Sequence, residues 1–492
     1  MANFFKPVVK SQKINEQLTV HIDKLDINGV GVARWQGKPI FIAGALPNEV
    51  AEVKVIEQKS KYARAKIIAI NKQNEHRVTP KCQHFGQCGG CDLQMLALSA
   101  QLTFKQQKVT ELFVRSLTAE DGIVKKRPNA KLTTQKTAIK TKKIDLPWQA
   151  PIQSEPWHYR RKARIGVQFD KNDLPIIGFR QKSTNQLTVI KSCPVLVEPV
   201  NNIFPILKQL LAQLTVKAAI GHIEVIHADI THVELENNTA PSVSQDDNSL
   251  VGESIVLVVR QLKVMNAIDT QLWQQFAKKH AWHVIIDNGA EQQALEHSKQ
   301  NVAPKLSYTL DDGNQIYFAS SDFIQINYQV NNAMISQALA WMNLGENDKV
   351  LDLFCGLGNF SLAIAKKSKQ VVGVEGVQVM VDKAIHNAQV NGLNNCQFYQ
   401  ADLNSEWLTA SWATAQVFDK VLLDPARAGA EQAVKQIATL KIPSVLYVSC
   451  DPATLARDSA ILVAQGYKIE KISLMDMFSQ TKHVETMVLF TQ

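Results

Sequence analysis

The stretch Val350-Leu351-Asp352-Leu353-Phe354-Cys355-Gly356-Leu357-Gly358-Asn359-Phe360 has the pattern of a buried strand, a glycine-rich turn and the start of a helix. Glycines in such a turn let the backbone approach a ligand closely, as in nucleotide-binding sites. A second apolar run, Val371–Glu375, ends in an acid that follows Asp352 by 23 residues. Since an acid that binds ribose hydroxyls is expected after roughly 20 residues, we expect Glu375 to contact a ribose.

Three more apolar runs follow, and a polar side chain comes directly or closely after each. The runs with these side chains are Cys396–Gln400 with Asp402, Lys420–Leu423 with Asp424, and Val445–Val448 with Cys450. Open α/β sheets bind their ligands beyond the carboxyl ends of the strands. Residues 321–492 are therefore predicted to form a doubly wound, Rossmann-like α/β sheet with its ligand above the strand ends.

The form of the glycine turn bears on the cofactor. Dehydrogenases share this fold class, so the fold alone does not name the ligand. The D-x-F-x-G-x-G form of this turn differs from the G-x-G-x-x-G fingerprint of dinucleotide-binding proteins. It resembles the S-adenosylmethionine loop of class I methyltransferases. That resemblance implies that Glu375 holds the ribose and Asp402 the adenine edge.

Cys450, in Ser449-Cys450-Asp451-Pro452, has two interpretations when it is taken alone. A free cysteine is among the most buried residue types, so it fits a sheet core. A thiol at the ligand-binding end of a strand is also well placed to act as a nucleophile. Cys355 and Cys396 lie inside apolar patterns, and we interpret both as core thiols.

Residues 11–73 predict a small β-barrel of the OB type. Five short strands broken by turn residues fit such a barrel: residues 18–22, 29–33, 39–42, 49–55 and 63–70. The stretch resembles a TRAM domain, an RNA-binding barrel. Its last hairpin carries four basic residues, Lys59, Lys61, Arg64 and Lys66. They form either a solvated edge or a surface for the RNA backbone.

Three cysteines in the pattern Cys82-x5-Cys88-x2-Cys91 lie among glycines that permit tight turns. Cys193 is the best candidate for a fourth ligand. Four thiolates suit either zinc or an iron–sulfur cluster, and the spacing does not separate the two. Chance clustering is the alternative. The site is expected to be closed, and hence structural or RNA-facing rather than catalytic.

Residues 74–320 are predicted to form a central α+β domain. It includes helices near 99–117 and 202–214 and strands near 222–234, 253–260, 282–287 and 305–318. Eight Lys or Arg residues and no acid fall between Lys125 and Lys143, which indicates a flexible basic insert at about 121–148. A polar gap at 237–248 predicts a loop. The basic stretch Trp157–Val167 contacts RNA in one interpretation and is structural in the other.

Composition limits the partners and the compartment. The chain has 492 residues and a net charge of +9, which favours an anionic partner. Its seven cysteines are odd in number and unevenly spaced, unlike a disulfide framework. We find no apolar run of about 18 residues and no export signal, so we expect a cytoplasmic protein.

Five motifs together resemble the RNA uracil-C5 methyltransferase family: Phe323–Asn327, the turn Asp352–Asn359, Leu423–Gly429, Ser449–Pro452 and His483–Thr486. The barrel and the four cysteines favour the branch that modifies 23S rRNA over the branch that modifies tRNA. The resemblance implies a [4Fe–4S] cluster on Cys82, Cys88, Cys91 and Cys193. It implies S-adenosylmethionine contacts from Gln325, Phe354, Asn359, Glu375, Asp402 and Asp424. Many members have proline where Ala426 stands.

The resemblance also assigns the chemistry, with Cys450 as nucleophile and Glu485 as base. C5 of uracil is a poor nucleophile until a thiolate adds at C6, and its proton must then be removed. Taken alone, Glu485 is more simply a surface acid at a strand edge. The alternatives are an enzyme acting on tRNA or another rRNA uridine, and a non-catalytic RNA-binding assembly factor. No obligate protein partner is inferred.

Overall fold

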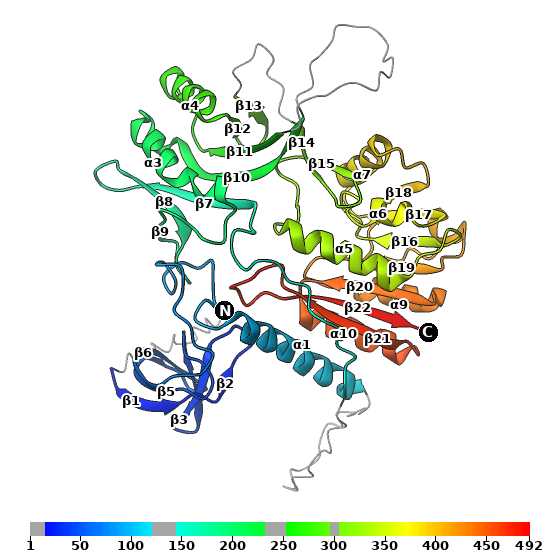
Figure 1. The fold of residues 1–492 in the computed structure, drawn as a ribbon, viewed down its shortest axis with the longest axis horizontal. Coiled ribbons are helices and arrows are strands. Elements are labelled where there is room, and N and C mark those ends of the chain that lie inside the picture. The colour runs from blue at the N-terminus through cyan, green and yellow to red at the C-terminus, as the bar shows by residue number, and fades with distance from the viewer. Residues whose placement is uncertain (1–14, 121–143, 232–251, 296–304) are drawn as a thin grey trace, which may run out of the picture. The chain divides into compact units, whose positions relative to one another are not determined.

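The computed structural model describes residues 15–120, 144–231, 252–295 and 305–492 (Figure 1). The basic insert between Lys125 and Lys143 and the polar gap at 237–248 lie outside the described residues. The chain divides into two compact units. The first comprises Met1–Lys108, Arg180–Thr188 and Phe478–Lys482, and the second comprises Val109–Phe179, Val189–Met477 and His483–Gln492.

The first unit contains the predicted barrel. Its strands are β1 (Gln17–His21), β2 (Lys24–Leu25), β3 (Gly31–Trp35), β4 (Lys38–Ile42), β5 (Val50–Gln58) and β6 (Ala63–Lys72), in the sheet order β1-β5-β6-β4-β3-β2. Alternate residues such as Ala51, Val53 and Val55 fill the barrel core, as the two-residue period of a strand requires. The five predicted strands are confirmed, and the two-residue strand β2 is an addition.

The first unit also holds the cysteine loop. Gly89 donates its N–H to the carbonyl of Arg180, 2.9 Å away, and Lys182 donates its N–H to that of Gln87. Helix α1 (Leu98–Glu120) begins in this unit, where the Gln101 side chain donates to the carbonyls of Leu93 and Leu96. The loop is therefore fixed by backbone hydrogen bonds.

The second unit begins with the central sheet, built from β7 (Lys162–Phe169), β8 (Pro175–Arg180), β9 (Leu187–Val189), β10 (Ile220–Thr231), β11 (Gly252–Gln261), β12 (Trp282–Asp287) and β13 (Gln292–Ala294). Helices α2 (Glu198–Asn201), α3 (Ile203–Gln213) and α4 (Ala267–His280) accompany it, and α3 and α4 bury Phe204, Leu207 and Trp273 in its core. The predicted strand at 305–318 is two strands, β14 (Lys305–Thr309) and β15 (Gln315–Phe318). Gly313 turns the chain between them with φ +84°.

The second sheet of this unit contains seven strands among the described residues. They are β16 (Lys349–Leu353), β17 (Gln370–Glu375), β18 (Cys396–Gln400), β19 (Lys420–Leu423), β20 (Ser444–Ser449), β21 (Lys468–Met475) and β22 (Glu485–Thr491), in the order β18-β17-β16-β19-β20-β22-β21. All pairings are parallel except those of β22. The helices are α5 (Tyr328–Met342), α6 (Ser361–Ala365), α7 (Gln378–Val390), α8 (Ser411–Thr414), α9 (Glu431–Leu440) and α10 (Pro452–Ala464).

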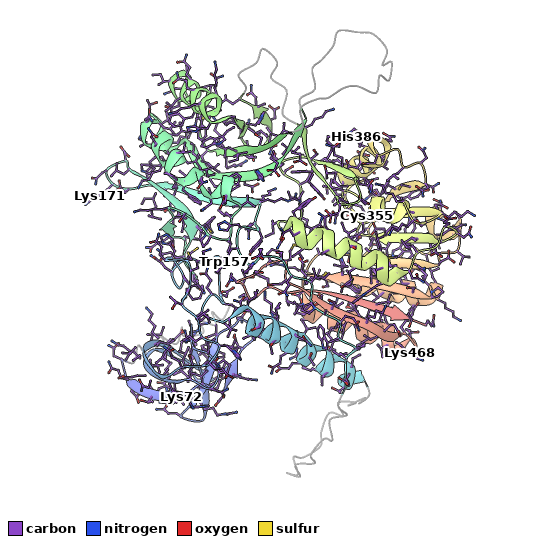
Figure 2. All side chains as sticks on the ribbon, in the orientation of Figure 1. Lys72, Trp157, Lys171, Cys355, His386 and Lys468 are labelled. Carbon is purple, nitrogen blue, oxygen red and sulfur yellow. The ribbon has the colours of Figure 1, made fainter. Side chains whose placement is uncertain are left out.

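This order confirms the predicted doubly wound sheet. The strand order reverses between β16 and β19, and such a switch point is where open α/β sheets bind ligands. Right-handed crossovers place α6 and α7 on one face and α9 and α10 on the other. Cys355 lies within this sheet region in Figure 2 and is buried, as predicted for a core thiol. No helix in the described part of the chain is both long and apolar enough to span a bilayer.

Candidate active site

Cys450 and Glu485 lie at the same end of two neighbouring strands. Strand β20 ends at Ser449, which pairs with Thr486 in the antiparallel strand β22. Cys450 follows Ser449 directly and Glu485 precedes Thr486 directly, and the charge of Glu485 raises the pKa of Cys450, so the two groups lie near each other. The structure therefore brings together the two residues that were predicted to act on a substrate, although 34 residues separate them in the sequence.

The acids beside the thiol oppose its ionisation. Burial raises the pKa of Cys450, Glu485 and Asp424 raise it further, and Arg427 lowers it. Burial, with a smaller contribution from Asp424, raises the pKa of Glu485 to about 8. Burial also raises the pKa of Asp424 to about 7. The Glu485 Oε2 atom is buried and has no hydrogen-bond partner among the described residues. The site thus holds two carboxyl groups that are largely protonated below neutral pH.

The glycine turn after β16 is closed by Glu375, at the end of β17. The Glu375 carboxylate accepts from the N–H of Gly356 at 3.2 Å and from that of Val377 at 3.2 Å. Phe354 has φ +63°, a conformation that is uncommon for a residue with a side chain and that clusters at ligand sites. Glu375 and Phe354 are therefore held at one turn, as predicted. Asp352 lies beneath it, buried and hydrogen-bonded to Ser361.

Gln325 and Asn359 come from separate segments of the second unit, and Asn359 is the last residue of the turn. Gln325 precedes α5 and is buried, and its Oε1 atom lacks a hydrogen-bond partner among the described residues. Asn359 exchanges hydrogen bonds with Asn331 of α5, at 3.2 and 3.0 Å. A buried acceptor without a partner beside a glycine turn suits a ligand that carries a hydrogen-bond donor.

Asp402 and Asp424 follow strands on opposite sides of β16. Asp402, after β18, is exposed and accepts from Ser405 Oγ at 2.8 Å and from the Asn404 N–H at 3.0 Å. These hydrogen bonds lower the pKa of Asp402 and keep it ionised. Asp424, after β19, donates its N–H to the Leu353 carbonyl at 3.4 Å. Five of the six predicted cofactor residues therefore end or follow strands of one sheet at its ligand-binding edge, and Gln325 precedes α5 in the same unit.

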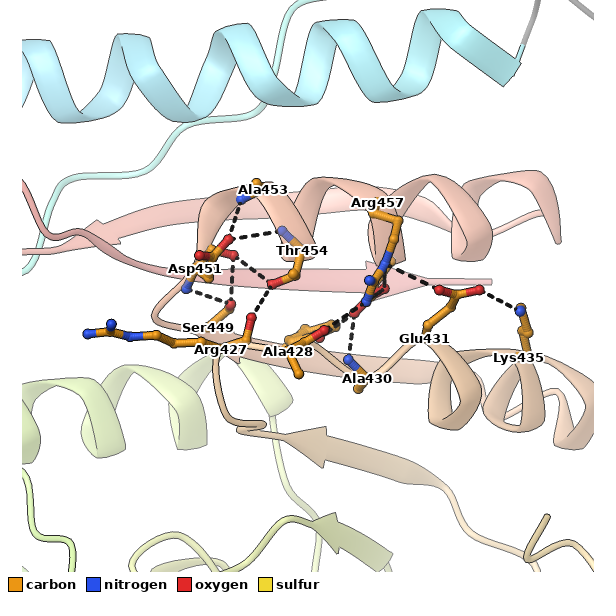
Figure 3. A network of polar contacts seen from close by, with 12 residues as sticks. Arg427, Ala428, Ala430, Glu431, Lys435, Ser449, Asp451, Ala453, Thr454 and Arg457 are labelled. Atoms are coloured by element: carbon orange, nitrogen blue, oxygen red, sulfur yellow. Dashed lines mark hydrogen bonds and ion pairs between the residues drawn. The ribbon is translucent and has the colours of Figure 1, made fainter. Parts of the chain in front are cut away.

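Helix α10 begins at Pro452, and its N-cap residue Asp451 follows Cys450 directly. Side chains of this helix form hydrogen bonds with the loop that follows Asp424 (Figure 3). Asp458 is fully buried and accepts from Tyr447 Oη and from the Ala430 N–H, each at 2.7 Å. Arg457 donates to Asp458 at 2.7 Å and to the Ala428 carbonyl at 3.1 Å. Sequence reasoning missed this network, and its only signal was a charged Arg457-Asp458 pair inside an apolar helix pattern.

Gly429 is required at the centre of this loop. It has φ +76°, and a Cβ atom there would lie 2.7 Å from Asp458 Oδ2 and 2.7 Å from Arg457 Nη2. No other residue fits so close to this ion pair without displacing it. Thr454 Oγ1 also donates to the Arg427 carbonyl at 3.3 Å. The backbone from Arg427 to Ala430 is therefore fixed against the helix that starts at the thiol.

In the basic stretch at 157–167, some side chains have structural contacts and others are exposed, as an RNA-contacting residue would be. Lys162 Nζ donates to the carbonyls of Ser320 and Asp322, at 2.8 and 3.1 Å. Arg161 is buried, whereas Arg164 is exposed and pairs with Glu224. Arg161 and Lys162 therefore have structural contacts inside the second unit, and only Arg164 of these three remains available to RNA.

The four predicted metal ligands belong to different units. Cys82, Cys88 and Cys91 lie in the first unit and Cys193 in the second. Burial raises the pKa of Cys88, and the nearby Cys82 raises it further. No group of three or more His, Cys, Asp or Glu side chains that could hold a metal ion occurs in the described ranges. The thiol chemistry fits a metal cluster, but the described geometry does not assemble one.

Comparison with known proteins places the chain among methyltransferases. The family profile "tRNA (Uracil-5-)-methyltransferase" matches residues 248–492, and the profile "TRAM domain" matches residues 11–68. The chain is 67% identical over 491 residues to the 23S rRNA (uracil(1939)-C(5))-methyltransferase RlmD of Colwellia psychrerythraea, covering 100% of this chain and 99% of that protein. It is 40% identical over 494 residues to the RlmD of Psychromonas ingrahamii, covering 100% of both.

A solved structure shows the same fold. It is the Pyrococcus abyssi tRNA (uracil-54, C5)-methyltransferase in complex with S-adenosyl-L-homocysteine, with a TM-score of 0.64 and 20% identity. The match covers 96% of this chain and 100% of that one. The architecture of a barrel, a central sheet and a Rossmann-like sheet is therefore shared with a protein of distant sequence.

We expect Asp458→Asn to destabilise the second unit. Asparagine keeps the size of the side chain but cannot accept from Tyr447, Ala430 and Arg457 together, so the free energy of unfolding should fall by about 2–4 kcal/mol. Urea denaturation would measure it. Glu431→Gln is the control, because it removes the exposed ion pairs of Glu431 with Arg457 and Lys435 and leaves Asp458 in place. Equal unfolding midpoints for Asp458→Asn and the wild type would contradict the assigned network.

We expect Glu485→Gln to stabilise the protein at pH 8 but not at pH 4.5. The folded protein keeps Glu485 protonated up to about pH 8, whereas the unfolded chain ionises it above about 4.5, so the wild type loses stability as pH rises through this window. Glutamine does not titrate, and its advantage should reach roughly 3 kcal/mol near pH 7. Urea midpoints at both pH values would show it. The exposed Glu470→Gln is the control, and a pH-independent difference for Glu485→Gln would contradict the assignment.

Proposed function

The chain belongs to the RNA uracil-C5 methyltransferase family that includes RlmD, and on this premise we propose that it methylates carbon 5 of a uracil in 23S rRNA. The methyl donor is S-adenosylmethionine. The observation that carries this proposal is the pairing of Ser449 with Thr486, which leaves the Cys450 thiol and the buried Glu485 carboxyl group at the same end of β20 and β22. A thiol and a base close together are what addition at C6 and proton removal at C5 require.

The residues present fit the proposed cofactor. Gln325, Phe354, Asn359, Glu375, Asp402 and Asp424 would hold S-adenosylmethionine. The unpartnered Oε1 of Gln325, the positive φ of Phe354 and the turn closed by Glu375 support this assignment. When bound, the cofactor supplies a methyl group as an electrophile on a sulfonium sulfur.

Cys450 prepares the uracil carbon. Its thiolate forms a bond to C6, and the electrons of the C5–C6 double bond move toward C5 and the adjacent carbonyl. This makes C5 nucleophilic enough to take the methyl group. Forming the thiolate is opposed by Glu485 and Asp424 while they are ionised and favoured by Arg427. Protonated acids next to the thiol therefore help the first step.

Glu485 completes the reaction. After C5 has taken the methyl group it still carries its proton, and the Glu485 carboxylate accepts that proton. The electron pair re-forms the C5–C6 double bond, and the Cys450 sulfur leaves. Glu485 must be ionised at this point, so it first releases its own proton to solvent, as the Cys450 thiol does before it adds to C6. Its raised pKa then makes the carboxylate a stronger base toward the C5 proton.

The RNA side of the proposal rests on the remaining parts of the chain. Residues 11–73 form the RNA-binding barrel, 74–320 the central RNA-binding domain and 321–492 the methyltransferase domain. A target uracil must leave its stack to reach a site at the edge of a sheet. Two alternatives remain: modification of a tRNA or another rRNA uridine, and a non-catalytic role in RNA assembly. Modification of another uridine would use the same site residues, whereas a non-catalytic role would give Cys450 and Glu485 no function.

The proposal includes a [4Fe–4S] cluster held by Cys82, Cys88, Cys91 and Cys193. The support is chemical, because four thiolates suit such a cluster. Glycines beside Cys88 and Cys91 allow the tight turns that convergence needs. The cluster takes no part in the methylation steps described above.

Cys450→Ala should abolish 5-methyluridine formation at the 23S rRNA target while leaving the affinity for S-adenosylhomocysteine within about twofold, because the thiol acts on the base. Modification maps of 23S rRNA and tRNA from a deletion strain carrying each variant would measure this. Glu485→Gln should instead accumulate a covalent RNA–protein adduct, seen on a denaturing gel, because Cys450 adds but the C5 proton stays.

Two results would go against the proposal. Retained methylation in Cys450→Ala would remove the nucleophile assignment. An unchanged 23S rRNA map with a lost tRNA modification would transfer the substrate to tRNA.

Anaerobically purified protein should contain iron and acid-labile sulfide at about four atoms each per chain. Cys88→Ala should lose most of the iron, because three thiolates hold a cluster poorly. Cys396→Ala is the control, since that thiol lies in β18 of the methyltransferase sheet. Elemental analysis would decide, and stoichiometric zinc without iron would refute the cluster.

A further inference from the structure

Arg161 is a buried cation in the second unit. It precedes β7, and only 6% of its surface is exposed. Its N–H donates to the Ile326 carbonyl at 3.1 Å, and its own carbonyl accepts from the His227 N–H at 2.8 Å. Burial lowers the pKa of the Arg161 guanidinium, and Tyr308, Asp229 and Tyr328 oppose that shift. Burying a charged guanidinium costs free energy, so we asked which groups the Arg161 guanidinium contacts and what those contacts hold in place.

The first contact fixes Gln325. Arg161 Nε donates to the Gln325 carbonyl at 3.0 Å. The backbone of this short segment before α5 has no regular structure of its own, so hydrogen bonds from Arg161 hold residues 325 and 326 in place. Gln325 is one of the residues proposed to bind the cofactor. Its side-chain oxygen has no partner in the described part of the chain.

The second contact leads to Asn359. The Arg161 guanidinium lies 4.4 Å from the centre of the Tyr308 ring and 5.8 Å from that of Tyr328. Such cation–π contacts orient both groups, especially when they are buried. Tyr308, on β14, donates its hydroxyl to Asn359 Oδ1 at 3.0 Å. Asn359 is the last residue of the glycine turn, and its side-chain amide also donates to Asn331 Oδ1 of α5 at 3.0 Å.

We infer that Arg161 is a positioning residue for the cofactor, acting on Gln325 directly and on Asn359 through Tyr308. This inference rests on the proposed function. Arg161 belongs to the basic stretch of the central domain. Its contacts nevertheless lead to Gln325 and, through Tyr308, to Asn359, both of which are proposed to hold S-adenosylmethionine. One guanidinium thus sets the spacing of two cofactor-binding side chains that come from separate segments of the methyltransferase domain.

The planar guanidinium is essential to this role. Lysine keeps the charge but has no Nε to donate at this angle and no flat face to stack on Tyr308. Methionine keeps most of the volume and loses every polar contact. Tyr308→Phe removes only the hydroxyl that reaches Asn359. Tyr317→Phe is the matched control, because Tyr317 lies on the adjacent strand β15 and donates its hydroxyl to Gln315 instead.

The test measures S-adenosylhomocysteine affinity by calorimetry, and affinity for a 23S rRNA fragment by gel shift, in the full-length variants. Tyr308→Phe should weaken cofactor affinity about fivefold, and Arg161→Met on the order of tenfold or more, as expected for neutral and charged hydrogen bonds. Arg161→Lys should fall between Arg161→Met and the wild type. RNA affinity should be unchanged in all variants. KM for S-adenosylmethionine should rise more than kcat falls.

Melting temperature checks folding, and Tyr308→Phe keeps the test decisive if Arg161→Met does not fold. Wild-type cofactor affinity in folded Tyr308→Phe and Arg161→Met would overturn the inference. So would equal losses of RNA and cofactor affinity in Tyr308→Phe, since a general loosening would then explain both. Failure of the wild type to bind S-adenosylhomocysteine at all would instead refute the proposed function, which is a separate result.

Discussion

The antiparallel register between β20 and β22 is the constraint on which the site depends. Side chains on a strand alternate between faces, so a slip of one residue would turn Glu485 away from Cys450. The structure prevents this slip from both sides, because β22 lies between β20 and β21 and pairs with each along its length. All residues from Glu485 to Phe490 are buried, so any other register would disturb packing on both faces. The position of the acid near the thiol is therefore a property of the sheet core.

A second feature of the site is that acids are kept neutral by burial. Burial raises the pKa of Asp352 and of Asp424 to about 7 and that of Glu485 to about 8. Such carboxyl groups cost stability near neutral pH, because the unfolded chain would ionise them. They gather at the carboxyl ends of β16, β19 and the start of β22, where the chemistry is proposed. Perturbed acids clustered at one sheet edge are typical of a functional site, and packing alone gives no reason for them.

The strand ends could be predicted from the sequence, whereas the contacts that hold them could not. Asp424 and Cys450 follow apolar runs that are visible in the printed chain. The link from Arg161 through Tyr308 to Asn359 joins segments almost 200 residues apart, and no spacing rule connects them. The same holds for Asp458, whose partners depend on how α10 packs against the loop before α9. The basic stretch left two interpretations open for a related reason, because sequence shows that Lys162 is charged but not that its amine donates to backbone carbonyls.

The segment before Glu485 adds a covalent constraint to the sheet register. Phe478–Lys482 belongs to the first unit, where Gln480 has φ +69°. The Gln480 carbonyl accepts from the N–H groups of Asp92 and Leu93. The Gln480 backbone N–H donates to Gln101 Oε1, and the Gln480 side-chain Oε1 accepts from Gln101 Nε2. A backbone held in this sparsely populated region persists only when its surroundings determine it from several sides. Four residues then separate the fixed Gln480 from Glu485, which begins β22. The chain therefore leaves a determined segment of the first unit shortly before it reaches Glu485, whose place in the second unit follows from the sheet register.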